Sequence, residues 1–75
     1  MALYQVTVWS DLKRPETPTL LAIAGMLQVP AKELEVDATR RATGIVIVKV
    51  RTVRDDVVKS IKHLLNVQSV KRIGV

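Results

Sequence analysis

The sequence predicts an α+β domain in which a four-stranded antiparallel sheet carries two helices on one face. The clearest element is residues 43–52, TGIVIVKVRT, where β-branched side chains favour an extended backbone. Three further stretches alternate apolar and polar side chains, and two other stretches repeat apolar side chains at helical spacing. The 75 residues are expected to form one domain, 1–75, in the order strand, helix, strand, strand, helix, strand.

The first strand is predicted over residues 3–10, because their side chains alternate between two faces. One face carries Tyr4, Val6 and Val8, and the other carries Gln5, Thr7 and Trp9. Pro15 disfavours helical geometry in the residue before it, so residues 11–16 are expected to form a loop.

The first helix is predicted over residues 18–28. Thr17 can cap free backbone N–H groups, and Pro18 suits the first helical position. The apolar stripe of this helix consists of Leu20, Ile23, Ala24 and Leu27. Gly25 lies on the opposite side, which carries no charge. Two interpretations stay open: a short helix that tolerates a glycine, or a close approach by a neighbouring chain or ligand.

Residues 33–38 predict a second strand that forms an antiparallel hairpin with the central strand, residues 43–52. In the second strand, Leu34, Val36 and Ala38 are expected to face inward, with carboxylates outward. In the central strand, the inward residues are Val46, Val48 and Val50, and the outward residues are Ile45, Ile47, Lys49 and Arg51.

The second helix is predicted over residues 53–65. A capping-box pattern from Thr52 to Asp55 opens it, and Asn66 is expected to end it in a left-handed conformation. Its apolar arc consists of Val57, Val58, Ile61, Leu64 and Leu65. Residues 68–75 complete the order βαββαβ as a fourth strand. This is the ferredoxin-like architecture, in which right-handed crossovers place both helices on one face of the sheet.

The composition narrows the classes of site and compartment. Without cysteine the chain has neither disulfides nor thiolate metal ligands, and the reducing cytoplasm is the simplest location. No cofactor is expected. Neither a signal peptide nor a membrane span is expected, because the longest uncharged stretch, residues 17–31, is interrupted by prolines and a glycine.

Residues that could perform catalysis are sparse. His63 is the only histidine, and it is expected on the solvated arc of the second helix. The glycines are isolated, so no phosphate-binding loop is predicted. No catalytic and no metal-binding residue is therefore expected, and the chain is not expected to be an enzyme by itself.

The net charge of +5 is concentrated in the second half of the chain. Candidate contacts for an anion are Arg40, Arg41, Lys71 and Arg72. A weak nucleic-acid-binding module is therefore one alternative function. It is not favoured, because Trp9 is the only aromatic candidate for base stacking on the open side of the sheet. Glu33, Glu35 and Asp37 are expected on the same side and would repel phosphate there.

An apolar patch is predicted on the open side of the sheet, where Trp9, Ile45 and Ile47 come together. Such a patch on a small domain predicts self-association into a dimer or higher oligomer, with Gly25 as a second candidate contact. The alternative is that the ends of the chain itself cover the patch.

Most of the chain resembles the ACT-type regulatory domains. The resemblance lies in the run from Val6-Thr7-Val8 through Lys13-Arg14-Pro15 into residues 20–27, LLAIAGML, and in residues 67–73, VQSVKRI. Glu16 stands where that family usually has glycine. The resemblance implies association through the sheet and a ligand-binding loop with Leu12, Arg14 and Thr17 as candidates. The leading hypothesis is a non-catalytic regulatory module that homo-oligomerises and binds a small ligand or a larger protein partner.

The opening strand is also similar to that of the small PurS-type subunit of formylglycinamidine ribonucleotide synthase, on residues 4–13, YQVTVWSDLK. Residues 36–40, VDATR, replace the Val-Arg-Ile-Gly-Lys segment of that family. This second resemblance implies another alternative, a small accessory subunit of a multi-subunit biosynthetic enzyme.

Overall fold

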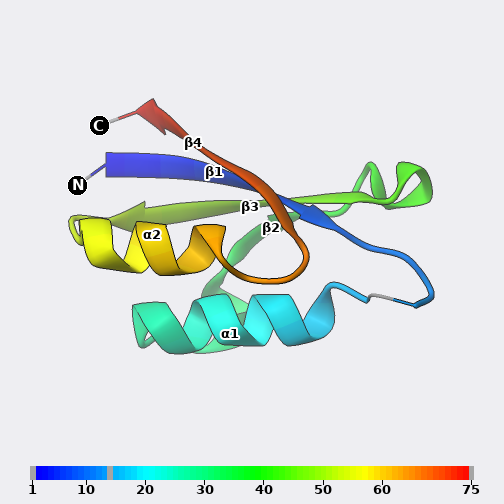
Figure 1. Cartoon of the computed structure of the whole chain (residues 1–75), viewed down its shortest axis with the longest axis horizontal. Coiled ribbons are helices and arrows are strands. Elements are labelled where there is room, and N and C mark those ends of the chain that lie inside the picture. The colour runs from blue at the N-terminus through cyan, green and yellow to red at the C-terminus, as the bar shows by residue number, and fades with distance from the viewer. Residues whose placement is uncertain (1, 14, 75) are drawn as a thin grey trace.

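A computed structural model describes residues 2–13 and 15–74, and it confirms the predicted fold class. Four antiparallel strands form one sheet, and two α-helices complete a ferredoxin-like α+β arrangement. The elements in chain order are β1 (Ala2–Trp9), α1 (Thr17–Leu27), the 3₁₀ turn η1 (Ala31–Glu33), β2 (Glu35–Asp37), the 3₁₀ turn η2 (Arg41–Thr43), β3 (Ile45–Thr52), α2 (Asp55–Lys62) and β4 (Val67–Gly74) (Figure 1).

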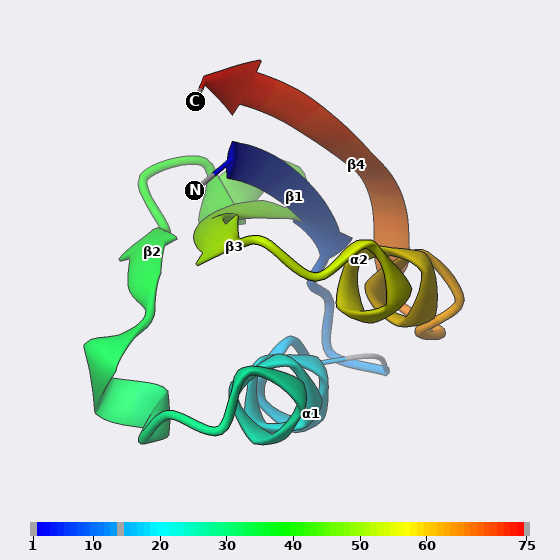
Figure 2. The same cartoon turned by 90° about the vertical axis from the view of Figure 1, so that its left-hand side faces the viewer.

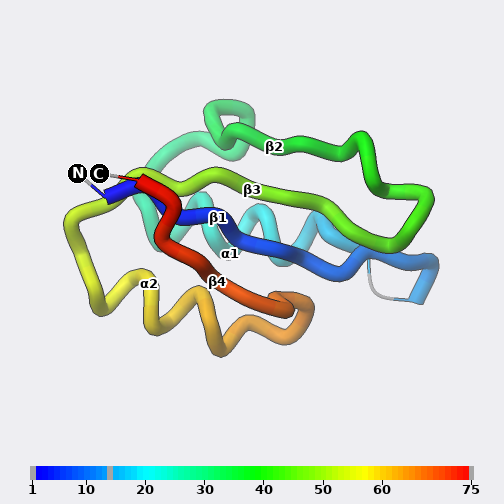
Figure 3. Tube along the Cα trace, turned by 90° about the horizontal axis from the view of Figure 1, so that it is seen from above, coloured from blue at the N-terminus to red at the C-terminus, as the bar shows by residue number. Residues whose placement is uncertain are grey.

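The sheet has the strand order β2-β3-β1-β4, so the first and third strands lie in its middle. Both helices lie on the same side of the sheet (Figure 2). Viewed from the opposite side, the strands lie in front and α1 lies behind them (Figure 3). One face of the sheet is therefore covered by helices, and the other face has no helix over it.

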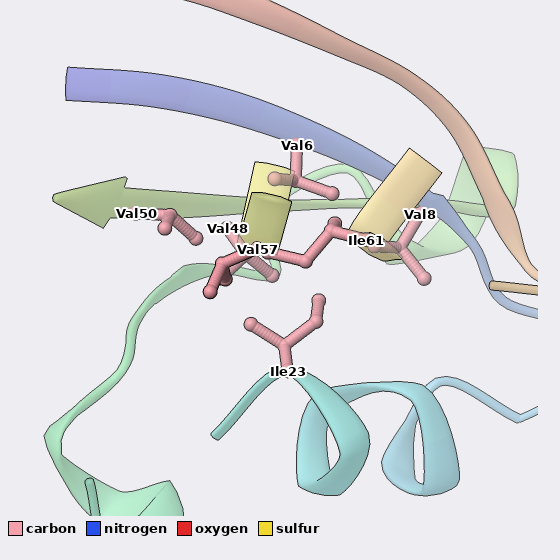
Figure 4. Close-up of a cluster of buried hydrophobic side chains, with 7 residues drawn as sticks. All are labelled: Val6, Val8, Ile23, Val48, Val50, Val57 and Ile61. Carbon is pink, nitrogen blue, oxygen red and sulfur yellow. The ribbon is translucent and has the colours of Figure 1, made fainter. Parts of the chain in front are cut away.

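The core forms between the sheet and the helices because alternate strand residues point the same way. Val6, Val48 and Ile23 are fully buried, from β1, β3 and α1 respectively. The complete buried cluster consists of Val6, Val8, Ile23, Val48, Val50, Val57 and Ile61 (Figure 4). These positions confirm the inward faces predicted for the first strand, the central strand and both helices.

The helix α1 begins at Thr17, one residue before the predicted start, with Glu16 at its N-cap. The N-cap makes no side-chain capping bond, so the cap predicted for Thr17 is wrong. The helix ends where Gln28 adopts a left-handed conformation with φ of 58° and its N–H donates to the carbonyls of Ala24 and Gly25.

The second strand is shorter than predicted. Glu33 donates its N–H to the carbonyl of Pro30, and Leu34 donates to Ala31, so these residues form the turn η1 and pairing begins only at Glu35. Val36 pairs with the buried Val48 and so lies on the inward face as predicted, but it is 40% exposed because it belongs to a three-residue edge strand. Glu33 therefore lies in a turn, and not in the predicted strand among the outward-facing carboxylates.

The second helix is also shorter than predicted. Thr52 belongs to β3, and its Oγ1 accepts the N–H of Arg54 at 3.1 Å, so the helix starts only at Asp55. It ends at Lys62, which leaves Leu65 80% exposed instead of in the core. The predicted capping box and the core assignment of Leu65 are both wrong.

Asn66 does not end α2 in a left-handed conformation. Among the described residues other than glycine, positive φ is found only at Gln28. Asn66 is instead buried, and its Nδ2 donates to the carbonyl of Pro15 at 3.2 Å. Within the described ranges, no helix is long and apolar enough to cross a membrane.

Candidate functional site

The face of the sheet that no helix covers, called the open face below, carries the predicted apolar patch. Trp9 of β1 pairs directly with Ile45 of β3, and Thr7 pairs with Ile47 one step along. Trp9 is 44% exposed, while both isoleucines are partly buried. The apolar patch, defined as Trp9, Ile45 and Ile47, thus lies on the open face as the alternation of the strands predicted.

Charged and polar residues occupy the rest of the open face in an ordered way. Strand pairing aligns four side chains in one row across the sheet, in the order Glu35, Lys49, Gln5 and Lys71. The next row toward Trp9 consists of Asp37, Ile47, Thr7 and Ser69. Acidic side chains therefore lie at the β2 edge of this face, and a basic side chain lies at its β4 edge.

A second feature lies where β1 ends, around a carboxylate held by two partners. Ser10 donates its hydroxyl hydrogen bond to Glu16 Oε2, and Arg41 Nη2 lies 2.5 Å from Glu16 Oε1. The Glu16 side chain is only 12% exposed, whereas that of Arg41 is 57% exposed. This group, called the Glu16 cluster below, therefore combines an anchored carboxylate with a guanidinium that solvent can reach.

The backbone at Gly44 builds the Glu16 cluster. Gly44 has φ of +82°, a backbone conformation that residues with a side chain rarely adopt. Its N–H donates to the backbone carbonyl of Arg41, which closes the turn η2. Its carbonyl accepts the N–H of Ser10 at 2.9 Å. The turn therefore places Arg41 beside the end of β1, within reach of Glu16 at the start of α1.

The Glu16 cluster borders a shallow hollow of about 530 Å³. The lining residues are Ser10, Asp11, Leu12, Glu16, Arg41, Ala42 and Gly44. Leu12 and Ala42 offer apolar contact, and Arg41 offers cationic donors. An arrangement of this kind suits a small molecule, or a peptide segment, with one anionic group and a short apolar part.

The hydroxyl of Ser10, the backbone hydrogen bond at the start of α1 and the charge of Arg41 together lower the pKa of Glu16 below its ordinary value. The ionised form is thus favoured in the folded state. Its contribution to stability is fully present above the ordinary pKa of glutamate, and it is lost as the pH falls through the lowered folded pKa.

Replacing Glu16 with glutamine is expected to lower the Tm at pH 7 by about 4–8 °C, which corresponds to a loss of about 1 kcal/mol in a domain of this size. The gap between wild type and variant should shrink once the pH falls below about 4.3. Thermal melts followed by circular dichroism across this range test the prediction. Glu33→Gln, at an exposed position, is the matched control. A gap that stays constant with pH contradicts the assigned role of Glu16.

The predicted ligand-binding loop is only partly assembled around the hollow. Leu12 lines the hollow and is fully exposed. Thr17 is exposed at the start of α1 and is not among the lining residues. Arg14 lies outside the described residues. Ser10, Glu16 and Arg41 thus contribute more to this site than the loop candidates predicted from the sequence.

The four candidate anion contacts fall into two groups. Arg40 and Arg41 follow β2, and Arg41 is paired with Glu16. Lys71 and Arg72 lie in β4, where they pair with Gln5 and Tyr4 of β1. The pairing places Lys71 on the open face, while Arg72 alternates to the other side of the strand.

Gly25 lies on α1, on the side of the sheet opposite the apolar patch. A Cβ atom added there would have nothing within 4 Å. No contact within the described chain therefore requires a glycine at this position, and Gly25 does not share a surface with Trp9.

The sequence does not predict the roles of Ser10 and Glu16 in this cluster, nor the buried hydrogen bond of Asn66. Ser10 and Asn66 are buried polar residues at the ends of predicted elements, and this was the only available signal. The sequence predicts Glu16 as a loop residue, because nothing local in the sequence connects it with Arg41.

Among the described residues, no group of three or more histidine, cysteine, aspartate or glutamate side chains is placed to hold a metal ion. The class of protein that the structure defines is a small ferredoxin-like α+β domain with one uncovered sheet face. No family model, curated protein or solved structure matches the chain.

Proposed function

We propose that this chain is a non-catalytic association module: two copies join through their open faces, and the hollow beside the Glu16 cluster receives a small ligand or a segment of a larger protein. The observation that carries this proposal is the apolar patch, where Trp9 is 44% exposed beside two isoleucines on a face without a helix. Contiguous apolar surface of this kind usually marks an interaction site.

The energetics favour a second copy over a lone chain. A domain of 75 residues removes only about 60% of its unfolded surface on folding, so its own core leaves little stability in reserve. Full burial of an isoleucine side chain stabilises an association by about 1.5–3 kcal/mol, and a tryptophan buries more area still. A symmetric dimer would bury each of these side chains twice.

The hollow supports the ligand-binding half of the proposal through its chemistry. Arg41 uses one side of its guanidinium to contact Glu16, and its exposed remainder offers further N–H donors to a carboxylate or phosphate. The resemblance to ACT-type domains adds the expectation of a small-molecule effector at this end of the sheet.

The test of association is the mass in solution. The wild-type protein is expected to show twice the 8.3 kDa chain mass by light scattering at high micromolar concentration. Trp9 is the only tryptophan, so its emission should also shift to shorter wavelength as the concentration rises. Ile47→Lys is expected to weaken the dimer at least about a hundredfold, because the dimer loses two buried isoleucines.

Leu21→Lys is the matched control for this variant, because it introduces the same side chain at an exposed position on α1, away from the open face. It should leave the mass unchanged. A wild-type protein that stays monomeric, or an Ile47→Lys variant that still forms dimers, counts against the proposal. A monomer that binds RNA or DNA with steep salt dependence would instead support the nucleic-acid alternative.

A further inference from the structure

Resting on the proposed function, we infer how the two copies are oriented: their open faces stack with the two-fold axis parallel to the strands, so that β2 of each copy lies over β4 of the other. The partner of this surface is thus a second copy of the chain in one defined orientation. The inference comes from the order of charges across the sheet.

The row that contains Glu35 determines the orientation. It begins with Glu35 on β2 and ends with Lys71 on β4, with Lys49 and Gln5 between them. Consider a two-fold rotation about an axis that is parallel to the strands and lies midway between β3 and β1. It places the β2 edge of one copy over the β4 edge of the other, and each residue keeps its position along the strand direction. Each Glu35 then faces Lys71 of the second copy, and each Lys49 faces a Gln5 amide.

The rows toward the end of β1 agree with the same axis. Asp37 and Ser69 occupy the two edges of the next row, so the carboxylate of one copy faces a hydroxyl of the other. Trp9 and Ile45 form the following pair, and the rotation places each Trp9 on an Ile45. Opposite charges therefore meet in the first row and apolar side chains meet in the third, while in the middle row Asp37 faces Ser69 and Ile47 faces Thr7.

Other arrangements bring like charges together. An axis perpendicular to the strands stacks β2 on β2, so that Glu35 and Asp37 meet the same residues of the other copy. If two β4 strands instead paired edge to edge in a continuous sheet, Lys71 and Arg72 of one copy would approach the same basic residues of the second copy. Like charges placed opposite each other disfavour both arrangements.

The test is a charge exchange between two variants, Glu35→Lys and Lys71→Glu. In the proposed orientation, homodimers of either variant contain two like-charge pairs. The dimer Kd of each variant is therefore expected to be at least about tenfold higher than that of wild type. A mixture of the two restores both pairs, with lysine facing glutamate on each side. Native mass spectrometry and light scattering should therefore show a heterodimer as tight as the wild-type homodimer.

Two control variants carry the same charge reversals away from the open face. Glu33→Lys lies in η1, and Lys59→Glu lies on the exposed side of α2. Both should form homodimers like wild type, and their mixture should show no preference for the heterodimer. Circular dichroism confirms the fold of each variant, since all four positions are exposed.

The outcomes separate the two proposals. A monomeric wild type overturns the proposed function, and the orientation falls with it. A dimeric wild type whose Glu35→Lys and Lys71→Glu variants remain equally dimeric, or fail to recover on mixing, overturns the orientation alone. Preferential pairing of Glu35→Lys with wild type instead of Lys71→Glu indicates the perpendicular axis and also overturns it.

Discussion

Replacing Ile23 with alanine is expected to lower the free energy of unfolding by about 2–5 kcal/mol. Ile23 is fully buried, and it projects from α1 into the valine cluster of β1 and β3 (Figure 4). Truncation removes apolar contact with that cluster and leaves a cavity, because close-packed strands relax only partially around a missing side chain.

This loss is large compared with the total free energy of unfolding of a domain of this size. At about 0.05–0.15 kcal/mol per residue, a domain of 75 residues is stable by about 4–11 kcal/mol. Urea unfolding followed by circular dichroism measures the change. Leu21→Ala is the control on the same helix, where the side chain is 57% exposed and the change should stay within about 0.5 kcal/mol. Equal effects of the two variants would show that α1 does not dock through Ile23.

The layers of this fold could be predicted from the sequence because alternation along a strand and periodicity along a helix are local properties. Val46, Val48 and Val50 alternate with outward residues, and all three are buried in the structure. Ile23 lies in the predicted apolar stripe of α1 and enters the core. The burial of these residues follows from the spacing of apolar side chains along the chain, and this spacing can be read directly from the sequence.

The ends of the elements could not be predicted, because they depend on competing hydrogen bonds. Glu33 looked like the start of a strand, yet its N–H is satisfied by Pro30 in a 3₁₀ turn. Thr52 looked like a helix cap, yet β3 extends to include it. In both places two local structures satisfy the same backbone groups, and pairing in three dimensions decides between them.

The two candidate sites also differ in how far the sequence predicts them. The apolar patch follows from alternation on two strands, so Trp9 and Ile45 were predicted, and their pairing places them side by side. The Glu16 cluster joins the start of α1 to η2, and no periodicity connects Glu16 with Arg41. A contact between distant loops becomes visible only once the turn at Gly44 brings them together.

Asn66 offers the second large effect. Asn66→Gly is expected to destabilise the fold by about 1–3 kcal/mol, because it removes a buried amide that donates to the carbonyl of Pro15. This bond connects the segment after α2 with the loop before α1. The backbone carbonyl of Asn66 also accepts a hydrogen bond from the N–H of Trp9 at 2.8 Å, so the same residue holds the end of β1 in place.

Gln28→Gly is the matched control, and it should behave in the opposite way. Gln28 is the residue with φ of 58°, and glycine adopts this left-handed conformation without the steric cost that other residues bear. The substitution is therefore expected to be neutral or to stabilise the protein by up to about 1 kcal/mol. Urea unfolding of both variants distinguishes a backbone role from a side-chain role. A harmless Asn66→Gly would show that the connection through Pro15 contributes little, and a damaging Gln28→Gly would contradict the backbone role assigned to Gln28.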